Sequence, residues 1–260
     1  MSNFEFIISI LGGFLAGVIN TFAGNGSTIT LGILTEVLGL PGNVANGTNR
    51  VGIFVQGIFS LEAFQRNQKI LWKESRIYVS IGIIGAILGA YVALQISSEQ
   101  FKFVYKYLML AILIVLFVNP KHWTNPQKIA KKLPLYASIP IFLALGFYGG
   151  FIQMGMGIFF LAIMVLVIGL PMLESNAIKV LMVTTYTAIV LAMFHYKGLI
   201  DWKTGLTIAI GQGLGGWMTA QWSSTFPEAN KWSYRILITI MILTLFHLFH
   251  LDAFIFKLFQ

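Results

Sequence analysis

Long apolar runs follow one another along almost the whole chain, and they constrain the fold more than any other feature. A helix needs about 20 mainly apolar residues to cross the hydrocarbon core of a bilayer. Hydrophobic residues make up 57% of the 260 residues and charged residues 10%, against roughly 25% charged residues in soluble domains. Candidate spans occupy residues 4–24, 51–64, 77–96, 103–118, 134–152, 180–196, 204–222 and 234–251. The sequence therefore predicts an all-α integral membrane protein.

Two further apolar runs, residues 27–40 and 157–170, are too short for an upright span. At about 1.5 Å per residue each reaches only roughly 21 Å, so we expect a tilted short helix, a half-helix or one half of a re-entrant hairpin. The total is eight to ten membrane segments. The basic loops Arg66–Arg76 and Lys121–Lys132 flank two of the spans, and the positive-inside rule makes them cytoplasmic.

A shift of 130 residues aligns the two halves of the chain without a gap over residues 31–113. "GLPGNVAN" then lies on "GLPMLESN", and the matched pairs include Pro41 with Pro171, Asn46 with Asn176 and Trp72 with Trp202. The match predicts two homologous pseudo-repeats, residues 1–118 and 134–260, joined by a basic cytoplasmic linker at 119–133. They are inverted if each holds five segments and parallel if each holds four. Duplicated halves with glycine-broken segments are typical of transporters whose site lies at the repeat interface.

The sequence lacks the residues and motifs of several classes of protein. It has no cysteine, and His247 and His250 have no third ligand beside them, so we expect no metal site and no cofactor. No phosphate-binding loop and no catalytic motif is present, which argues against an ATP-driven pump and against an enzyme. The net charge of +8 comes from lysine and arginine in the loops. Such residues orient a protein in the membrane and contact anionic lipid. They are also compatible with an anionic solute, and we expect no nucleic-acid partner.

Glycines interrupt the apolar pattern at two corresponding places. In "AGNGST" the glycines Gly24 and Gly26 can leave the helical conformation, while Asn25 and Ser27 are residue types that begin a helix. In "YGGFIQMGMG" the aligned glycines are Gly155 and Gly157, and Gln153 is the one amide. A helix that begins at membrane depth presents free N–H groups and a positive dipole end, which bind anions. The alternative is a surface turn without a ligand.

A cation closely follows an asparagine near the start of each long helix that comes next. "NVANGTNRVGIFVQ" contains Arg50 and "ESNAIKVLMVTTY" contains Lys179. A cation at a helix end usually reaches the membrane interface, but the number of polar residues around Arg50 exceeds what a cap needs. An arginine fork matches an oxyanion with two acceptors. Glu36, in the first short run, is a candidate proton-coupling group or an interfacial residue.

These residues resemble the signatures of the TauE/SafE family, described as sulfite or sulfonate exporters. "INTFAGNGS" is similar to the family pattern INTxAGGGS and is followed by "GLPGNVANGTNR", and the second half resembles the second family repeat. Asn25 stands where a third glycine is usual. The resemblance implies a multi-pass permease of about eight helices in a bacterial inner membrane that moves sulfite or an organosulfonate. The motif residues carried over are Asn20, Thr21, Gly24, Gly26, Ser27, Asn46, Thr48, Asn49, Arg50, Asn176 and Lys179.

Together these features predict a secondary transporter that exports a small sulfur-containing anion by alternating access at the repeat interface. The predicted substrate-binding set comprises the motif residues with Asn25, Gln153, Gly155 and Gly157. An anion channel and a non-transporting membrane scaffold or subunit stay open as alternatives, as does assembly into a homo-oligomer.

Overall fold

The computed structural model of the chain describes residues 1–70, 72–95, 97, 99–100 and 133–226, with single positions at 228, 231, 232, 235, 238, 239 and 242. The predicted span at 103–118, nearly all of the span at 234–251, most of the linker at 119–133, and His247 and His250 lie outside the described residues. Every regular element in the described part is a helix, so the all-α prediction is confirmed.

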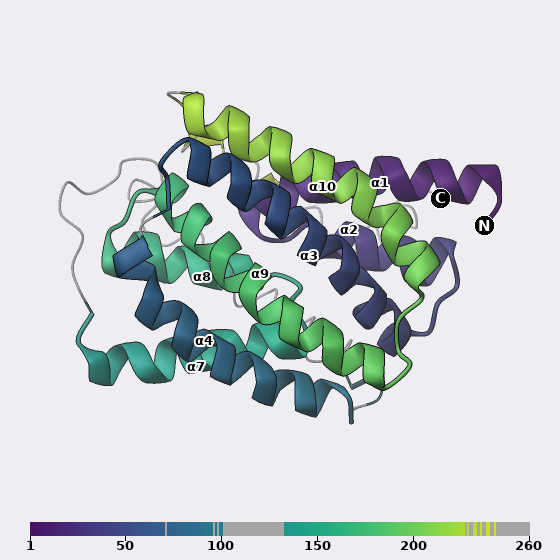
Figure 1. The fold of residues 1–260 in the computed structure, drawn as a ribbon, viewed down its shortest axis with the longest axis horizontal. Coiled ribbons are helices and arrows are strands. Elements are labelled where there is room, and N and C mark those ends of the chain that lie inside the picture. Colours follow the sequence, from purple (N-terminus) through teal and green to yellow (C-terminus); the bar gives the residue numbers. More distant parts are fainter. Residues whose placement is uncertain are drawn as a thin grey trace, which may run out of the picture.

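The same order of elements occurs twice along the chain (Figure 1). The first half contains α1 (Asn3–Ala23), α2 (Ser27–Gly32), the π-helical turn η1 (Ile33–Val37), α3 (Gly42–Arg66) and α4 (Trp72–Ala93). The second half contains α7 (Leu135–Phe151), α8 (Met156–Ala162), η2 (Ile163–Ile168), α9 (Met172–Tyr196) and α10 (Trp202–Thr225). Helix α3 runs from residue 42 to 66 and α9 from 172 to 196, a difference of 130 at both ends. The duplication itself stays a prediction, and these bounds are consistent with it.

Local sequence signals place the helix ends. Ser2 begins α1, because its hydroxyl accepts from the Glu5 amide at 3.2 Å while the Glu5 carboxylate accepts from the Ser2 amide at 2.7 Å. Pro41 and Pro171 immediately precede the two long helices α3 and α9. Helix α1 ends at Gly24, whose φ of 76° is open to glycine and strained for other residues. The chain thus leaves helical geometry between α1 and α2.

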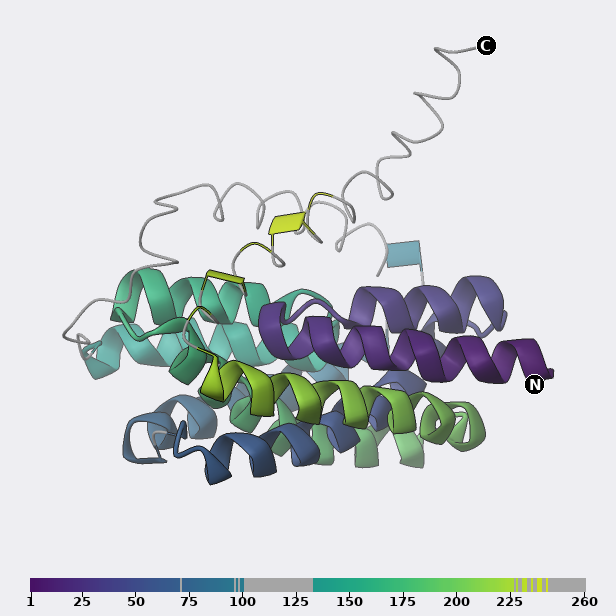
Figure 2. The same cartoon turned by 90° about the horizontal axis from the view of Figure 1, so that it is seen from above.

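The last long helix that the structure describes in each half packs against the other half. Helix α10 lies along α1 and α3, whereas α4 lies along α7 and α9 (Figures 1 and 2). Close approach depends on small residues: a Cβ at Gly215 would overlap the Phe14 carbonyl of α1, and one at Gly85 would overlap the Leu143 carbonyl of α7. The two groups, α1/α3/α10 and α4/α7/α9, meet where α3 contacts α9.

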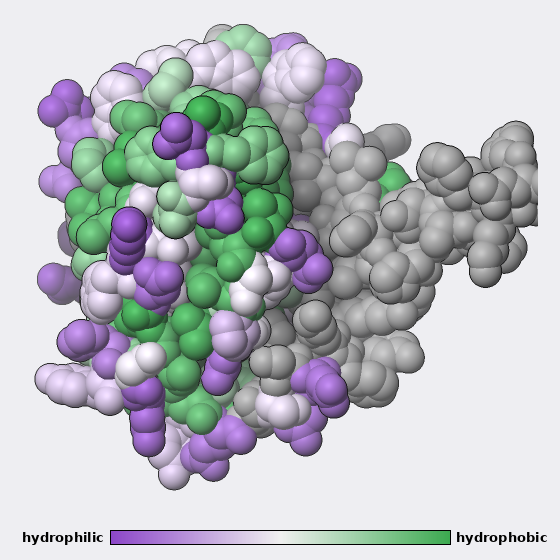
Figure 3. All heavy atoms as spheres, turned by 90° about the vertical axis from the view of Figure 1, so that its right-hand side faces the viewer, coloured by the Kyte–Doolittle hydropathy of each residue, from purple (hydrophilic) through white to green (hydrophobic). Residues whose placement is uncertain are grey.

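The outer faces of the helices are apolar. Exposed side chains on α1 recur every three or four residues, and Leu11 is 60% exposed; Ile84 on α4 and Ile210 on α10 are 58% and 54% exposed. At the end of the molecule seen in Figure 3, hydrophilic side chains border the hydrophobic ones. Continuous apolar surfaces of this kind are rare on proteins surrounded by water, whereas lipid is itself apolar and covers them favourably. The chain is a membrane protein.

Three of the described helices are long and apolar enough to cross a bilayer: α1, residues 75–93 of α4, and α9. Helices α3 and α10 are of similar length, with 25 and 24 residues, but carry more polar side chains. The short segment 27–37 reaches roughly 16 Å at about 1.5 Å per residue, about half of a 30 Å hydrocarbon core. The total of eight to ten segments stays a prediction.

The contact between α10 and α1 can be tested at one glycine. We expect Gly215→Ala to lower Tm, because its methyl group meets a backbone carbonyl that cannot move independently, and such overpacking costs about 1–3 kcal/mol. Gly32→Ala is the control, since nothing lies within 4 Å of the added Cβ, and alanine favours a helix over glycine. Thermal unfolding of both variants in detergent gives the comparison. An unchanged Tm for Gly215→Ala would contradict this account.

Candidate functional site

Side chains of α3 cap the carboxyl end of α7 in the other half. Arg50 donates from Nη2 to the Gly150 carbonyl at 2.6 Å and from Nη1 to the Gly149 carbonyl at 3.4 Å. One turn earlier, Asn46 donates to the Phe151 carbonyl at 3.4 Å. The guanidinium also lies 5.0 Å from the ring centroid of Phe194, within the range of a cation–π contact. The last turn of α7 is thus bound from α3.

Side chains of α9 do the same for the carboxyl end of α1. The Lys179 ammonium donates to the Asn20 carbonyl at 2.9 Å and to the Thr21 carbonyl at 3.2 Å. Asn176 donates to the Phe22 carbonyl at 3.2 Å and accepts from Lys179 at 2.5 Å. Each half of the chain therefore supplies an asparagine and a cation that cap the broken helix of the other half.

This reciprocal arrangement has a clear physical cause. The last carbonyls of a helix have no partner within the helix, and lipid cannot supply one. A cation at the carboxyl end also interacts favourably with the negative end of the helix dipole. Arg50 is 0% exposed and Lys179 is 2% exposed. Among the described residues the ion pairs join only surface groups, namely Met1 with Glu5, Arg66 with Glu62 and Lys231 with Glu228, so both buried cations lack a carboxylate partner.

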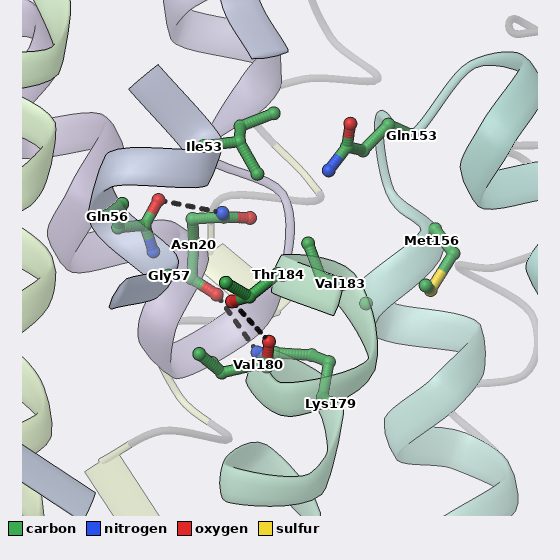
Figure 4. Close-up of a pocket in the computed structure, with 12 residues that line it drawn as sticks. Asn20, Ile53, Gln56, Gly57, Gln153, Met156, Lys179, Val180, Val183 and Thr184 are labelled. Carbon is green, nitrogen blue, oxygen red and sulfur yellow. Dashed lines mark hydrogen bonds between the residues drawn. The ribbon is translucent and has the colours of Figure 1, made fainter. Parts of the chain in front are cut away.

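A small pocket lies where the two broken helices meet (Figure 4). Gly24 and Gly157 touch each other through their backbones, because a Cβ on either would overlap the other. The pocket measures about 20 Å³, which is room for about one water molecule. Its lining residues are Asn20, Gly24, Ile53, Gln56, Gly57, Gln153, Met156, Gly157, Lys179, Val180, Val183 and Thr184.

The structure brings some of the predicted site residues to this pocket and leaves others away from it. Those that line it are Asn20, Gly24, Gln153, Gly157 and Lys179. Arg50 lies behind Gln153, whose Oε1 accepts from Arg50 Nη1 at 2.9 Å. Gly155, with φ of 77°, begins α8. Asn46 and Asn176 contact the ends of the broken helices, and Thr21 lies in the last turn of α1, where its carbonyl accepts from Lys179.

Several residues of the predicted substrate-binding set instead form hydrogen bonds within loops and short helices. Thr48 accepts from the Asp201 amide at 2.9 Å, and Asn49 accepts from Thr30 of α2 at 2.5 Å. The remaining members of the set are Asn25, which accepts from Thr28 at 2.8 Å, and Gly26 and Ser27, which start α2. Glu36 is exposed on η1 and accepts from Thr35 at 3.1 Å. None of these lines the pocket.

Sequence reasoning missed a network of amides beside the pocket. Gln56 accepts from Asn20 Nδ2 at 2.9 Å and from Gln212 Nε2 at 3.3 Å. Its own nitrogen donates to Thr21 Oγ1 at 3.0 Å. Gln212, on α10, is 0% exposed. The available signal was a lone glutamine in an apolar helix, since polar residues inside membrane segments are rare and usually functional.

Comparison with known proteins identifies the family. The family model described as sulfite exporter TauE/SafE matches residues 9–248. The chain belongs to the TauE/SafE family. This is a family of membrane transporters and not a class of enzyme.

Several proteins with sequences similar to this TauE/SafE chain are named as transporters. The "probable membrane transporter protein ORF9" of Sinorhizobium sp is 28% identical over 203 residues, which cover 78% of this chain and 77% of that protein. A "probable membrane transporter protein" of Haemophilus influenzae is 27% identical over 229 residues, 88% of each chain. The "probable membrane transporter protein YfcA" of Escherichia coli K12 is 24% identical over 204 residues, covering 78% and 75%. No solved structure matches the chain.

The cap on α7 predicts that Arg50→Lys lowers Tm although the charge is kept. At position 50 a lysine offers one point charge in place of the two nitrogens, Nη1 and Nη2, from which the guanidinium reaches its acceptors in a fixed geometry, and each buried acceptor left without a donor costs about 1–3 kcal/mol. Arg66→Lys is the matched control, because Arg66 lies on the same helix with 73% of its side chain exposed. Thermal unfolding in detergent is the measurement. Equal Tm values for the two variants would show that the fork geometry is not needed.

Proposed function

We propose that this TauE/SafE transporter exports a small sulfur-containing anion, such as sulfite or an organosulfonate, across the bacterial inner membrane. It does so as a secondary transporter by alternating access at the interface between the two halves. The observation that carries the proposal is the Lys179 ammonium, a buried cation that lines the pocket between the two broken helices and has no carboxylate partner in the part of the chain that the structure describes.

Electrostatics favours an anion at this position. A buried charge without a counter-charge is unfavourable in a low-dielectric interior, and the Arg50 charge lies one side chain further back, behind Gln153. A bound anion would compensate the positive charge. The three N–H donors of Lys179 contact Asn20, Thr21 and Asn176, so the anion replaces one of these acceptors when it binds.

The small size of the pocket indicates that the two halves separate when a solute binds. A volume of about 20 Å³ does not admit a sulfur oxyanion, so binding requires the two halves to separate around it. Gly24 and Gly157 touch across the interface, so such a separation would move their backbones apart. Export suits the direction of the membrane potential, because about 100 mV, negative inside, contributes roughly 2.3 kcal/mol for each negative charge that leaves.

The direct test is counterflow of labelled sulfite in proteoliposomes that contain the purified full chain. We expect saturable uptake driven by unlabelled sulfite inside, and competition by organosulfonates. Uptake that neither saturates nor shows counterflow would favour a channel. No uptake by folded protein, whichever of these anions is supplied, would refute the proposal and favour a scaffold or subunit.

The Lys179 assignment has its own test in the same assay. Lys179→Met is expected to reduce sulfite counterflow at least tenfold, because the pocket loses its one ionisable lining residue. Lys203→Met is the control: it removes the same charge from an exposed position at the start of α10 and should leave counterflow within twofold of wild type. Wild-type counterflow by Lys179→Met would exclude the ammonium from the transport site.

A further inference from the structure

The two amides that face each other across the pocket have orientations fixed by their neighbours. An amide nitrogen only donates and an amide oxygen only accepts. The orientation of each amide therefore follows from the group bound to its other end, even though nitrogen and oxygen have similar shapes. Asn20 and Gln153 lie on opposite sides of the pocket (Figure 4).

Gln153 turns its nitrogen toward the pocket. Arg50 can only donate, so the bond of 2.9 Å from Arg50 Nη1 requires the oxygen of Gln153 to face Arg50. The nitrogen then faces the other way, where one N–H reaches Thr187 Oγ1 at 3.3 Å. Its second N–H has no acceptor among the described residues. This side of the pocket therefore offers a hydrogen-bond donor.

Asn20 turns its oxygen toward the pocket. The Gly17 carbonyl can only accept, so the Gln56 nitrogen must face it, at 3.5 Å, and the Gln56 oxygen faces Asn20. The nitrogen of Asn20 donates to that oxygen at 2.9 Å. The oxygen of Asn20 therefore points into the pocket, where it accepts no hydrogen bond from the described residues. Gln212, which also donates to the Gln56 oxygen, holds the same orientation.

We infer that the pocket selects sulfur oxyanions that also carry a hydrogen-bond donor, such as hydrogensulfite or an amino- or hydroxy-substituted sulfonate, over oxyanions that have none. This inference rests on the proposed function. The negative oxygens of such a solute face Lys179 and Gln153, and its O–H or N–H faces the oxygen of Asn20. An oxyanion without a hydrogen-bond donor places lone pairs or an alkyl group next to the oxygen of Asn20. That oxygen then stays without a hydrogen bond, which is unfavourable.

A pair of nearly isosteric anions tests the inference. Sulfamate and methanesulfonate have the same charge and differ in an amino group against a methyl group. In counterflow of labelled sulfite by the wild-type chain, we expect sulfamate to inhibit at a concentration at least tenfold lower than methanesulfonate. In Asn20→Leu, which removes the acceptor, the ratio should fall to near one. Asn43→Leu is the control, because Asn43 is exposed at the start of α3, and it should keep the wild-type ratio.

The outcomes separate this inference from the proposed function. Equal inhibition by the two anions in a wild-type chain that transports sulfite would overturn the inference and leave the function standing. If sulfite counterflow is absent, the two anions are compared by the rise in Tm that they cause in the purified wild-type protein, which reports binding directly. A rise with sulfamate at a tenfold lower concentration supports the inference without transport. Equal rises, or no rise with either anion, overturn it.

Discussion

Helices that end inside an apolar interior must have their last carbonyls bound by some other part of the protein, and this requirement organises the whole molecule. The carboxyl ends of α1 and α7 both lie at chain breaks, and each receives an asparagine and a cation from the long helix of the opposite half. Hydrogen bonds from charged donors contribute about 1.5–3 kcal/mol each. Neither half can keep its broken helix satisfied without the other.

The two caps share a plan but use different cations, and the difference separates their roles. The Arg50 guanidinium is planar and binds two carbonyls and one amide oxygen in a fixed geometry, away from the pocket. Its Nε is buried without a partner among the described residues. The Lys179 ammonium is a point charge on a flexible stem and lines the pocket. Arg50 therefore positions Gln153, whereas under the proposed function Lys179 is the group that exchanges partners.

The sequence predicted the elements well and their long-range contacts poorly. Apolar runs predicted spans at 51–64 and 180–196, which lie within the long helices α3 and α9, and the polar residues around Arg50 exceed what a helix cap needs. Their partners were not readable, because Arg50 binds carbonyls about 100 positions further along and any residue type supplies a carbonyl. The fork of Arg50 was therefore predicted to bind an anion directly, whereas it binds the carbonyls of Gly149 and Gly150. Gln212 escaped notice because small residues dominate its surroundings.

The exchange of α4 and α10 between the two halves defines two packed groups of helices. The packed groups are α1/α3/α10 and α4/α7/α9, each of which contains helices from both halves of the sequence. Arg50 reaches from α3 in the first group to α7 in the second, and Lys179 reaches from α9 in the second to α1 in the first. Both caps therefore cross the same boundary, and separation of the groups strains them together. When the groups separate, Lys179 loses its hydrogen bonds to the carbonyls of α1. Under the proposed function, a bound anion replaces those carbonyls as the acceptor. Solute binding therefore stabilises the separated arrangement, which is unfavourable without the solute.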